Sequence, residues 1–286
     1  MLVFLTAALG LAWFGDRAGL VDWAATVLAR AGRGSTRRLY ALVCIVAALL
    51  TAVVSLDGAV VLMVPVVSLL ARRHRIEFVP FFLGVVAVAN AASLAVPEGN
   101  PTNLVVMERL GLTPEAFLPH LFLPGVCAAL FAGIVPARRL QTGRYAIVPG
   151  REEGETRRRF LVPARIGMQV IGLLAALRGL VPSLAGDGHR LAGLVVIAAG
   201  AAVASALANN LPVSAAVATF LTGGPGAYAA LIGLTVGALA TPHGSVATMI
   251  ARDLAGEDGE LTIRILGPAS GLAVLAATVC LWILSS

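Results

Sequence analysis

The sequence has 286 residues, of which 58% are hydrophobic and 13% charged, whereas soluble globular proteins average about 25% charged residues. All 21 basic residues are arginine, against 15 acidic residues, and the arginines fall in short connections between long apolar stretches. Arginines in such connections orient membrane proteins, so they favour a multi-pass protein of the inner (plasma) membrane. The expected partner is the lipid bilayer, and no nucleic-acid partner is expected.

The first part of the chain, 1–136, is predicted to lie mostly in the membrane. Residues 1–15 form a short crossing, or the chain has lost upstream sequence, because no signal-peptide pattern is present. Residues 18–31 are amphipathic, with Leu20 and Trp23 on the apolar face, and are expected to lie in the membrane interface. Three further elements follow: an interrupted hairpin (39–71), a broken helix (78–110) and a plain crossing (117–136).

An arginine-rich cytoplasmic loop, 137–165, leads to a second part, 166–286, in which the same order of elements returns. The predicted elements are a crossing (166–185), a hairpin (191–221), a broken helix (227–254) and a final crossing (262–284). Broken helices at corresponding places of two repeats are typical of secondary transporters. The sequence therefore predicts a transporter-like internal repeat.

Charge predicts the orientation of these elements. Stretch 39–71 is too long for one crossing and short for two, and arginines flank both of its ends. We therefore expect a re-entrant hairpin from the cytoplasm, with a pair of full crossings as the alternative. Only Arg109, Arg178 and Arg190 then lie outside. The predicted fold is an all-α polytopic membrane protein built from two inverted repeats.

The four interruptions are predicted to form the functional site. Backbone groups freed at a helix break cost several kcal/mol in lipid, so such breaks line a protein interior or a watery cavity. Half-helix N-termini suit oxyanions or hydroxylated solutes, and unwound carbonyls suit cations. The predicted substrate- or ion-binding residues are Ser55, Asp57, Asn90, Ser93, Glu98, Asn100, Thr102, Asn103, Asn209, Asn210, Thr241, Gly244, Ser245 and Thr248.

A purely structural interpretation competes with this one, because prolines kink membrane helices and Ser or Thr often bonds its own backbone. Four polar clusters in repeated positions favour the functional interpretation for the set. Ionisable residues at membrane depth are costly and are usually functional, which singles out Asp57 and then Glu98 for proton coupling. His243 is expected to be a hydrogen-bonding spacer.

Four motifs carry a family resemblance: Ser55-Leu56-Asp57-Gly58-Ala59, Asn100-Pro101-Thr102-Asn103-Leu104, Asn209-Asn210-Leu211-Pro212 and Thr241-Pro242-His243-Gly244-Ser245. They resemble the hairpins and broken helices of arsenite-efflux permeases (arsenical-pump membrane proteins). That family belongs to an ion-transporter superfamily together with the dicarboxylate:sodium symporters. The resemblance implies a transporter, not an enzyme, that exchanges arsenite or antimonite for protons and needs no cofactor or metal.

The sequence departs from this family at three points. Leu56 stands where relatives usually carry asparagine, and His243 stands where they carry an apolar residue. Family members are also longer, and each half here lacks the pair of scaffold helices that normally precedes it. The missing helices predict a homodimer or a second membrane subunit. Two small-residue surfaces are the predicted contact faces: Gly125, Ala128, Ala129, Ala132 and Gly133; and Gly193, Gly200 and Ala204.

Three other functions compete with arsenite efflux. A sodium-coupled carboxylate carrier would have the same arrangement of hairpins and broken helices. An intramembrane enzyme would use Asp57, Glu98 or His243, although no nucleophile–histidine or metal-ligand pattern is present. A truncated, non-transporting subunit would explain the missing helices. No nucleotide-binding motif is present, so any ATPase would be a separate subunit.

Overall fold

The computed structural model describes residues 19–147, 190–256 and 263–286. Helices dominate these ranges, which contain no named strand, and four helices are long and apolar enough to cross a membrane. The predicted all-α polytopic class is confirmed. The expected crossings 1–15 and 166–185, and most of the arginine-rich loop, lie outside the described residues.

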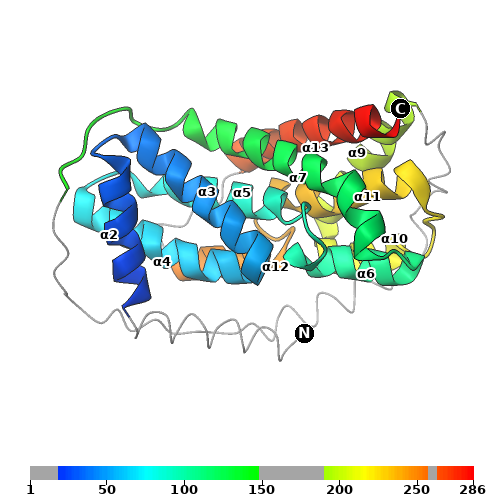
Figure 1. Cartoon of the computed structure of the whole chain (residues 1–286), viewed down its shortest axis with the longest axis horizontal. Helices are drawn as coiled ribbons and strands as arrows, with labels where there is room; N and C mark the ends of the chain where they lie inside the picture. The colour runs from blue at the N-terminus through cyan, green and yellow to red at the C-terminus, as the bar shows by residue number, and fades with distance from the viewer. Residues whose placement is uncertain (1–18, 148–189, 257–262) are drawn as a thin grey trace.

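The first half places one helix across the others. Helix α2 stands across one end of the molecule, whereas α7 and α13 run along its length (Figure 1). A crosswise amphipathic helix at the end of a set of membrane-length helices fits the expected position in the interface. The elements of this half are α2 (Leu20–Gly32), α3 (Thr36–Val54), α4 (Leu56–His74), α5 (Phe78–Ala92), η1 (Pro97–Gly99), α6 (Pro101–Leu110) and α7 (Pro114–Ala137).

The second half has the same alternation of long and short helices. Its described elements are α9 (Leu191–Ala208), α10 (Asn210–Val217), α11 (Gly224–Gly237), η2 (Ala238–Ala240), α12 (Val246–Ala255) and α13 (Ile263–Ser285). Helix α13 packs along α7, and Ser270 on α13 donates a hydrogen bond to the carbonyl of Val236 on α11 (3.1 Å). The two halves are thus packed together by α7 and α13.

Two residues with positive φ interrupt the hairpins. Ser55 has φ 91° between α3 and α4, and Asn209 has φ 71° between α9 and α10. A right-handed helix requires negative φ, and L-residues other than Asn and Asp rarely accept positive values. Each helix must therefore end there and restart one residue later.

Helix α3 is longer than the sequence interpretation assumed. It has 19 residues and meets the length and composition of a membrane span by itself. In the alternative in which 39–71 is a pair of crossings, α3 is therefore long enough to be one of them. The re-entrant arrangement stays a prediction.

One predicted contact face is wrong. Gly125, Ala128, Ala132 and Gly133 on α7 are buried within the chain. A Cβ added to Gly125 would lie 2.5 Å from the backbone nitrogen of Ala95, which shows how closely α7 approaches the end of α5. Small residues permit such approach between membrane helices of one chain as well as between subunits, and the sequence does not distinguish the two. Gly200 on α9 is exposed, and a Cβ added there would meet no atom within 4 Å.

Candidate functional site

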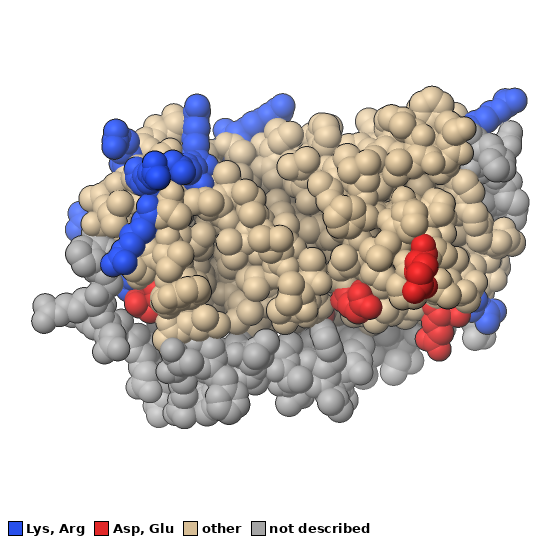
Figure 2. Space-filling model, in the orientation of Figure 1, with Lys and Arg blue, Asp and Glu red and all other residues tan. Residues whose placement is uncertain are grey.

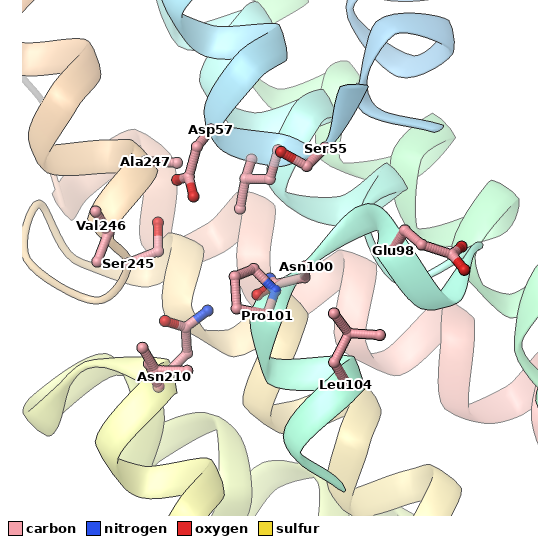
Figure 3. A pocket seen from close by; sticks show the side chains of 12 residues that line it. Ser55, Asp57, Glu98, Asn100, Pro101, Leu104, Asn210, Ser245, Val246 and Ala247 are labelled. Atoms are coloured by element: carbon pink, nitrogen blue, oxygen red, sulfur yellow. The ribbon is translucent and has the colours of Figure 1, made fainter. Parts of the chain in front are cut away.

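The four interruptions meet around one cavity of about 340 Å³. Figure 3 shows residues from all four surrounding the same space, with α4 on one side and α10 on the other. Breaks that are far apart in sequence are thus brought together by packing of the two halves. The lining residues are Ser55, Leu56, Asp57, Glu98, Asn100, Pro101, Leu104, Asn210, Leu211, Ser245, Val246 and Ala247.

Four helix N-termini border this cavity. Helices α4, α6, α10 and α12 begin directly after Ser55, Asn100, Asn209 and Ser245. The cavity lining includes either the capping residue or the first helical residue of each. A helix N-terminus carries unpaired N–H groups and about half a positive charge, so the cavity suits negatively charged or electron-rich oxygen atoms.

Three of the four caps are closed by their own side chains. The side-chain oxygens of Asn100, Asn209 and Ser245 accept hydrogen bonds from Thr102 N (3.0 Å), Leu211 N (3.3 Å) and Thr248 N (3.1 Å). Ser55 makes no such bond, and its buried Oγ has no partner among the described residues. The N-terminus of α4 is therefore the least satisfied of the four.

Asp57 lies in the first turn of α4 and is 5% exposed. Its carboxylate lies near Ala247 and faces the side of the cavity that holds Ser245 (Figure 3). Within the described ranges it forms no ion pair or side-chain hydrogen bond, and no basic side chain is among the cavity-lining residues. Keeping such a carboxylate charged is costly, so it is a good acceptor for a proton or for a solute hydroxyl group.

Glu98 does not lie beside Asp57. Its side chain is exposed, and its carboxylate points away from Asp57 at the edge of the cavity (Figure 3). The cavity therefore holds one buried acid, and the second predicted acid is at its rim. His243 is likewise exposed, and its backbone carbonyl rather than its ring makes the described contact.

Two hydrogen bonds cross between the halves behind the cavity. Ser245 donates to Asn90 Oδ1 (3.0 Å), which joins the cap of α12 to α5. Thr235 on α11 donates to Asn103 Oδ1 in the first turn of α6 (3.1 Å). Each broken helix thus fixes the short helix of the other half, and all four side chains are buried.

The remaining predicted polar residues support these bonds. Ser93 donates to the carbonyl of Asn90 (2.7 Å) and accepts from Asn100 Nδ2 (3.2 Å). Asn103 Nδ2 donates to the carbonyls of Ser93 and Val96. Thr102 is fully buried, and its Oγ1 has no partner among the described residues. Ser93, Thr102 and Asn103 thus lie within the break and do not line the cavity, whereas Asn100 does.

The second hairpin tip is tied to the neighbouring break. The backbone N–H of Asn210 donates to the carbonyl of Gly244 (2.8 Å), and Asn209 Nδ2 donates to that of His243 (3.0 Å). Thr241 Oγ1 donates to the carbonyl of Ala206 (2.6 Å) on α9. Asn209, Thr241 and Gly244 thus hold the tip in place rather than line the cavity.

Both breaks follow the same local pattern, proline, one variable residue, glycine and the cap: Pro97-Glu98-Gly99-Asn100 and Pro242-His243-Gly244-Ser245. A Cβ on Gly99 would lie 2.4 Å from the carbonyl oxygen of Ser93, and one on Gly244 would lie 2.0 Å from that of Ala238. These two carbonyls belong to the residues that cap the ends of α5 and α11. Glycine is required at both places because the backbone turns back onto the preceding helix end.

Thr235, a polar residue that joins the two halves, is not among the residues predicted from the sequence. It lies three residues before the residue that caps the end of α11, as Asn90 lies three residues before the one that caps α5. Alignment of the two breaks on their shared pattern would have revealed it, whereas polarity near the prolines did not.

The profile of the citrate transporter family (CitMHS) matches residues 1–147. The chain belongs to this family. The match covers the first half, including the first hairpin and the first broken helix. The match supports the predicted resemblance at the level of the ion-transporter superfamily, and membership of the arsenite-permease family itself stays a prediction.

Three relatives of this citrate transporter family member are named as transporters. An uncharacterized transporter of Mycobacterium bovis is 31% identical over 55% of this chain and 38% of its own length. The silicon efflux transporter LSI3 of rice (Oryza sativa subsp. japonica) is 32% identical over 46% of this chain and 26% of its own. A Dictyostelium discoideum protein with the transporter name arsB is 29% identical over 24% of this chain and 12% of its own. The matches thus span well under half of each of these relatives.

Proposed function

We propose that the chain is the substrate-binding core of a secondary transporter for a small hydroxylated solute, with arsenite or antimonite efflux in exchange for protons as the leading case. The observation that carries this proposal is the convergence of four helix N-termini on a cavity that also holds the buried carboxylate of Asp57. The N-termini supply N–H donors, and Asp57 supplies an acceptor.

This mixture of groups fits a neutral hydroxylated acid. Each hydroxyl group of arsenous or silicic acid can both donate and accept, so it can use a helix N-terminus and a carboxylate together. The names of the rice and Dictyostelium relatives, silicon efflux transporter and arsB, support this chemistry.

The second candidate is a carboxylate carrier coupled to sodium, which the family description supports. Helix N-termini bind carboxylates well. Against a polycarboxylate, the described cavity has no arginine or histidine in its lining and has two acidic residues, Asp57 and Glu98. A multiply charged anion would therefore need a cation to enter with it.

Proton coupling is assigned to Asp57. Its burial makes the charged and neutral forms differ strongly in their interactions with the cavity, so substrate and proton are expected to compete for it. Glu98, at the rim, is expected to assist the exchange of protons with the outside rather than bind substrate.

The transporting unit is proposed to be larger than one chain. Helices α3 and α9 expose large apolar residues along their outer faces, among them Leu49 (61%), Val53 (83%) and Leu207 (71%). A homodimer or a separate membrane subunit would supply the wall against which this core moves.

The proposed location is the inner membrane, with the start of α3 in the cytoplasm. Cysteine at Ser35, before α3, is then expected to be protected from an impermeant thiol reagent in intact cells. Cysteine at Thr113, before α7, is expected to be labelled. Labelling at Ser35 with protection at Thr113 would reverse the orientation. The same orientation predicts protection at Gly150 and labelling at Gly188, which lie outside the described residues.

Transport assays test the substrate. The full chain is reconstituted in vesicles, and uptake of arsenite, antimonite, silicic acid and citrate is measured under imposed proton or sodium gradients. Proton-driven uptake of the hydroxylated acids supports the leading proposal, and sodium-driven citrate uptake supports the second. Binding of a solute without transport of any solute points to the non-transporting subunit, because the cavity would then recognise a solute without moving it.

A further inference from the structure

A second surface lies far from the cavity, at the end of the molecule crossed by α2. The chain segment after α7 joins three helix ends there. Tyr145 donates its backbone N–H to the carbonyl of Gly34 (2.9 Å) and its hydroxyl group to that of Ala29 (2.8 Å). Thr36 Oγ1 donates to the carbonyl of Gly143 (2.9 Å). The ends of α2 and α7 and the start of α3 are therefore held at one place.

This arrangement gathers arginines that are separate in sequence. Figure 2 shows basic side chains concentrated at this end of the molecule. In the described residues the ion pair at this end joins Arg73 to Asp22, and Glu77 is the other acidic residue of the surrounding segments. The exposed arginines of these segments are Arg30, Arg33, Arg37, Arg38, Arg72, Arg75, Arg138, Arg139 and Arg144. We call them, with α2, the arginine end.

Helix α2 adds an apolar face beside this charge. Leu20 (42%), Trp23 (62%) and Val27 (44%) are exposed, whereas Ala25 and Ala29 on the other face are buried against the protein. Tryptophan prefers the headgroup level of a bilayer. Because α2 lies across the direction of α7 and α13 (Figure 1), its exposed face can enter the acyl boundary along its whole length.

We propose that the arginine end is a binding surface for anionic phospholipids. Arginine pairs with phosphate through two parallel N–H groups, and clusters of basic residues next to membrane segments bind anionic headgroups. Insertion of the apolar face of α2 into the bilayer would hold the neighbouring arginines at the depth of the headgroup phosphates. This surface is independent of the solute that occupies the cavity.

The proposal is tested with the full chain in mild detergent, by native mass spectrometry with phosphatidylglycerol and phosphatidylcholine of identical acyl chains. We expect preferential retention of phosphatidylglycerol. The double variant Arg37→Gln/Arg38→Gln should weaken it by about tenfold or more, since each arginine near a lipid surface contributes about a fivefold change in affinity. Trp23→Ala should also lower retention.

The control removes the same charge from elsewhere. Arg109→Gln/Arg190→Gln changes arginines at the end of α6 and before α9 and should leave the lipid preference unchanged. Equal retention of the two lipids by the parent chain overturns the proposal. So does an equal loss in both double variants, because the effect would then reflect net charge rather than this surface.

Discussion

The two hairpin tips that meet at the cavity share a backbone geometry and differ in chemistry. Ser55 and Asn209 both have positive φ, and a helix restarts directly after each. The tip at Asn209 is bound to the neighbouring break through the carbonyls of His243 and Gly244. The tip at Ser55 has a serine hydroxyl group without a described partner and is followed by Leu56 and the acid Asp57.

This difference suits the two tips to different tasks in the proposed carrier. A tip held by two hydrogen bonds is suited to keep its helix N-terminus in a fixed position. A tip with an unsatisfied hydroxyl group and an unpaired carboxylate can change its interactions when a solute or proton arrives. We therefore expect the tip at Ser55 to respond to ligands and the tip at Asn209 to stay in a fixed position.

The largest expected effect is on transport by Asp57→Asn. This change keeps the shape of the side chain and removes its charge and its proton. Proton-driven uptake in vesicles should be lost, whereas exchange of solute against solute should be partly retained. An unchanged pH dependence of transport in this variant would remove Asp57 from the coupling mechanism. Asp253→Asn on α12, outside the cavity lining, is the matched control.

The next effect is on stability and concerns the break that holds the second tip. Gly244→Ala places a Cβ 2.0 Å from the carbonyl oxygen of Ala238, and a backbone clash of this kind is expected to cost roughly 2–4 kcal/mol. Gly200→Ala on α9, where the added carbon meets no atom within 4 Å, should be neutral or slightly stabilising. Thermal unfolding in detergent compares the two. Similar melting temperatures would contradict the described turn.

A smaller effect is expected from the bond that crosses the halves. Thr235→Val keeps the side-chain volume and leaves Asn103 Oδ1 without its donor, which should cost about 1–3 kcal/mol. Thr278→Val is the control, since Thr278 is equally buried and bonds only the carbonyl of Val274 in its own helix (2.8 Å). If both variants unfold at the same temperature, the crossed bond does not stabilise the packing of the halves.

The smallest effect tests the comparison of the tips most directly. Asn209→Gly keeps the positive φ available and removes two side-chain bonds, the one to the carbonyl of His243 and the cap bond from Leu211 N, at a cost of about 1 kcal/mol. Amide hydrogen exchange should become faster around 209–213 and stay unchanged around 55–59. Ser55→Gly, which removes a hydroxyl group without a described partner, should change exchange less. If Ser55→Gly changed amide exchange more than Asn209→Gly, the tip at Ser55 would be the fixed one.

Much of this site could be predicted from the sequence because helix breaks have local causes. Pro97, Gly99, Pro242 and Gly244 mark turns, and polar residues in apolar stretches mark buried interactions. The predicted positions Ser55, Asp57, Asn100, Asn210 and Ser245 therefore do line one cavity. Their roles as binding residues are predictions that the transport assays test.

Tertiary structure decided which polar residues face the cavity and which lie behind it. Asn90 and Asn103 point into bonds with the opposite half, Thr235 donates to Asn103, and Glu98 turns to the rim. Hydropathy and spacing determined the membrane class, the helix breaks and their polar content, because these follow from local backbone chemistry and transfer free energy. The side on which a polar group finds its partner depends on contacts between α5, α11 and the short helices, and Asn90 and Ser245 are 155 residues apart in the chain. Tertiary structure also decided the role of the small residues of α7, because close packing within a chain and close packing between chains require the same side chains.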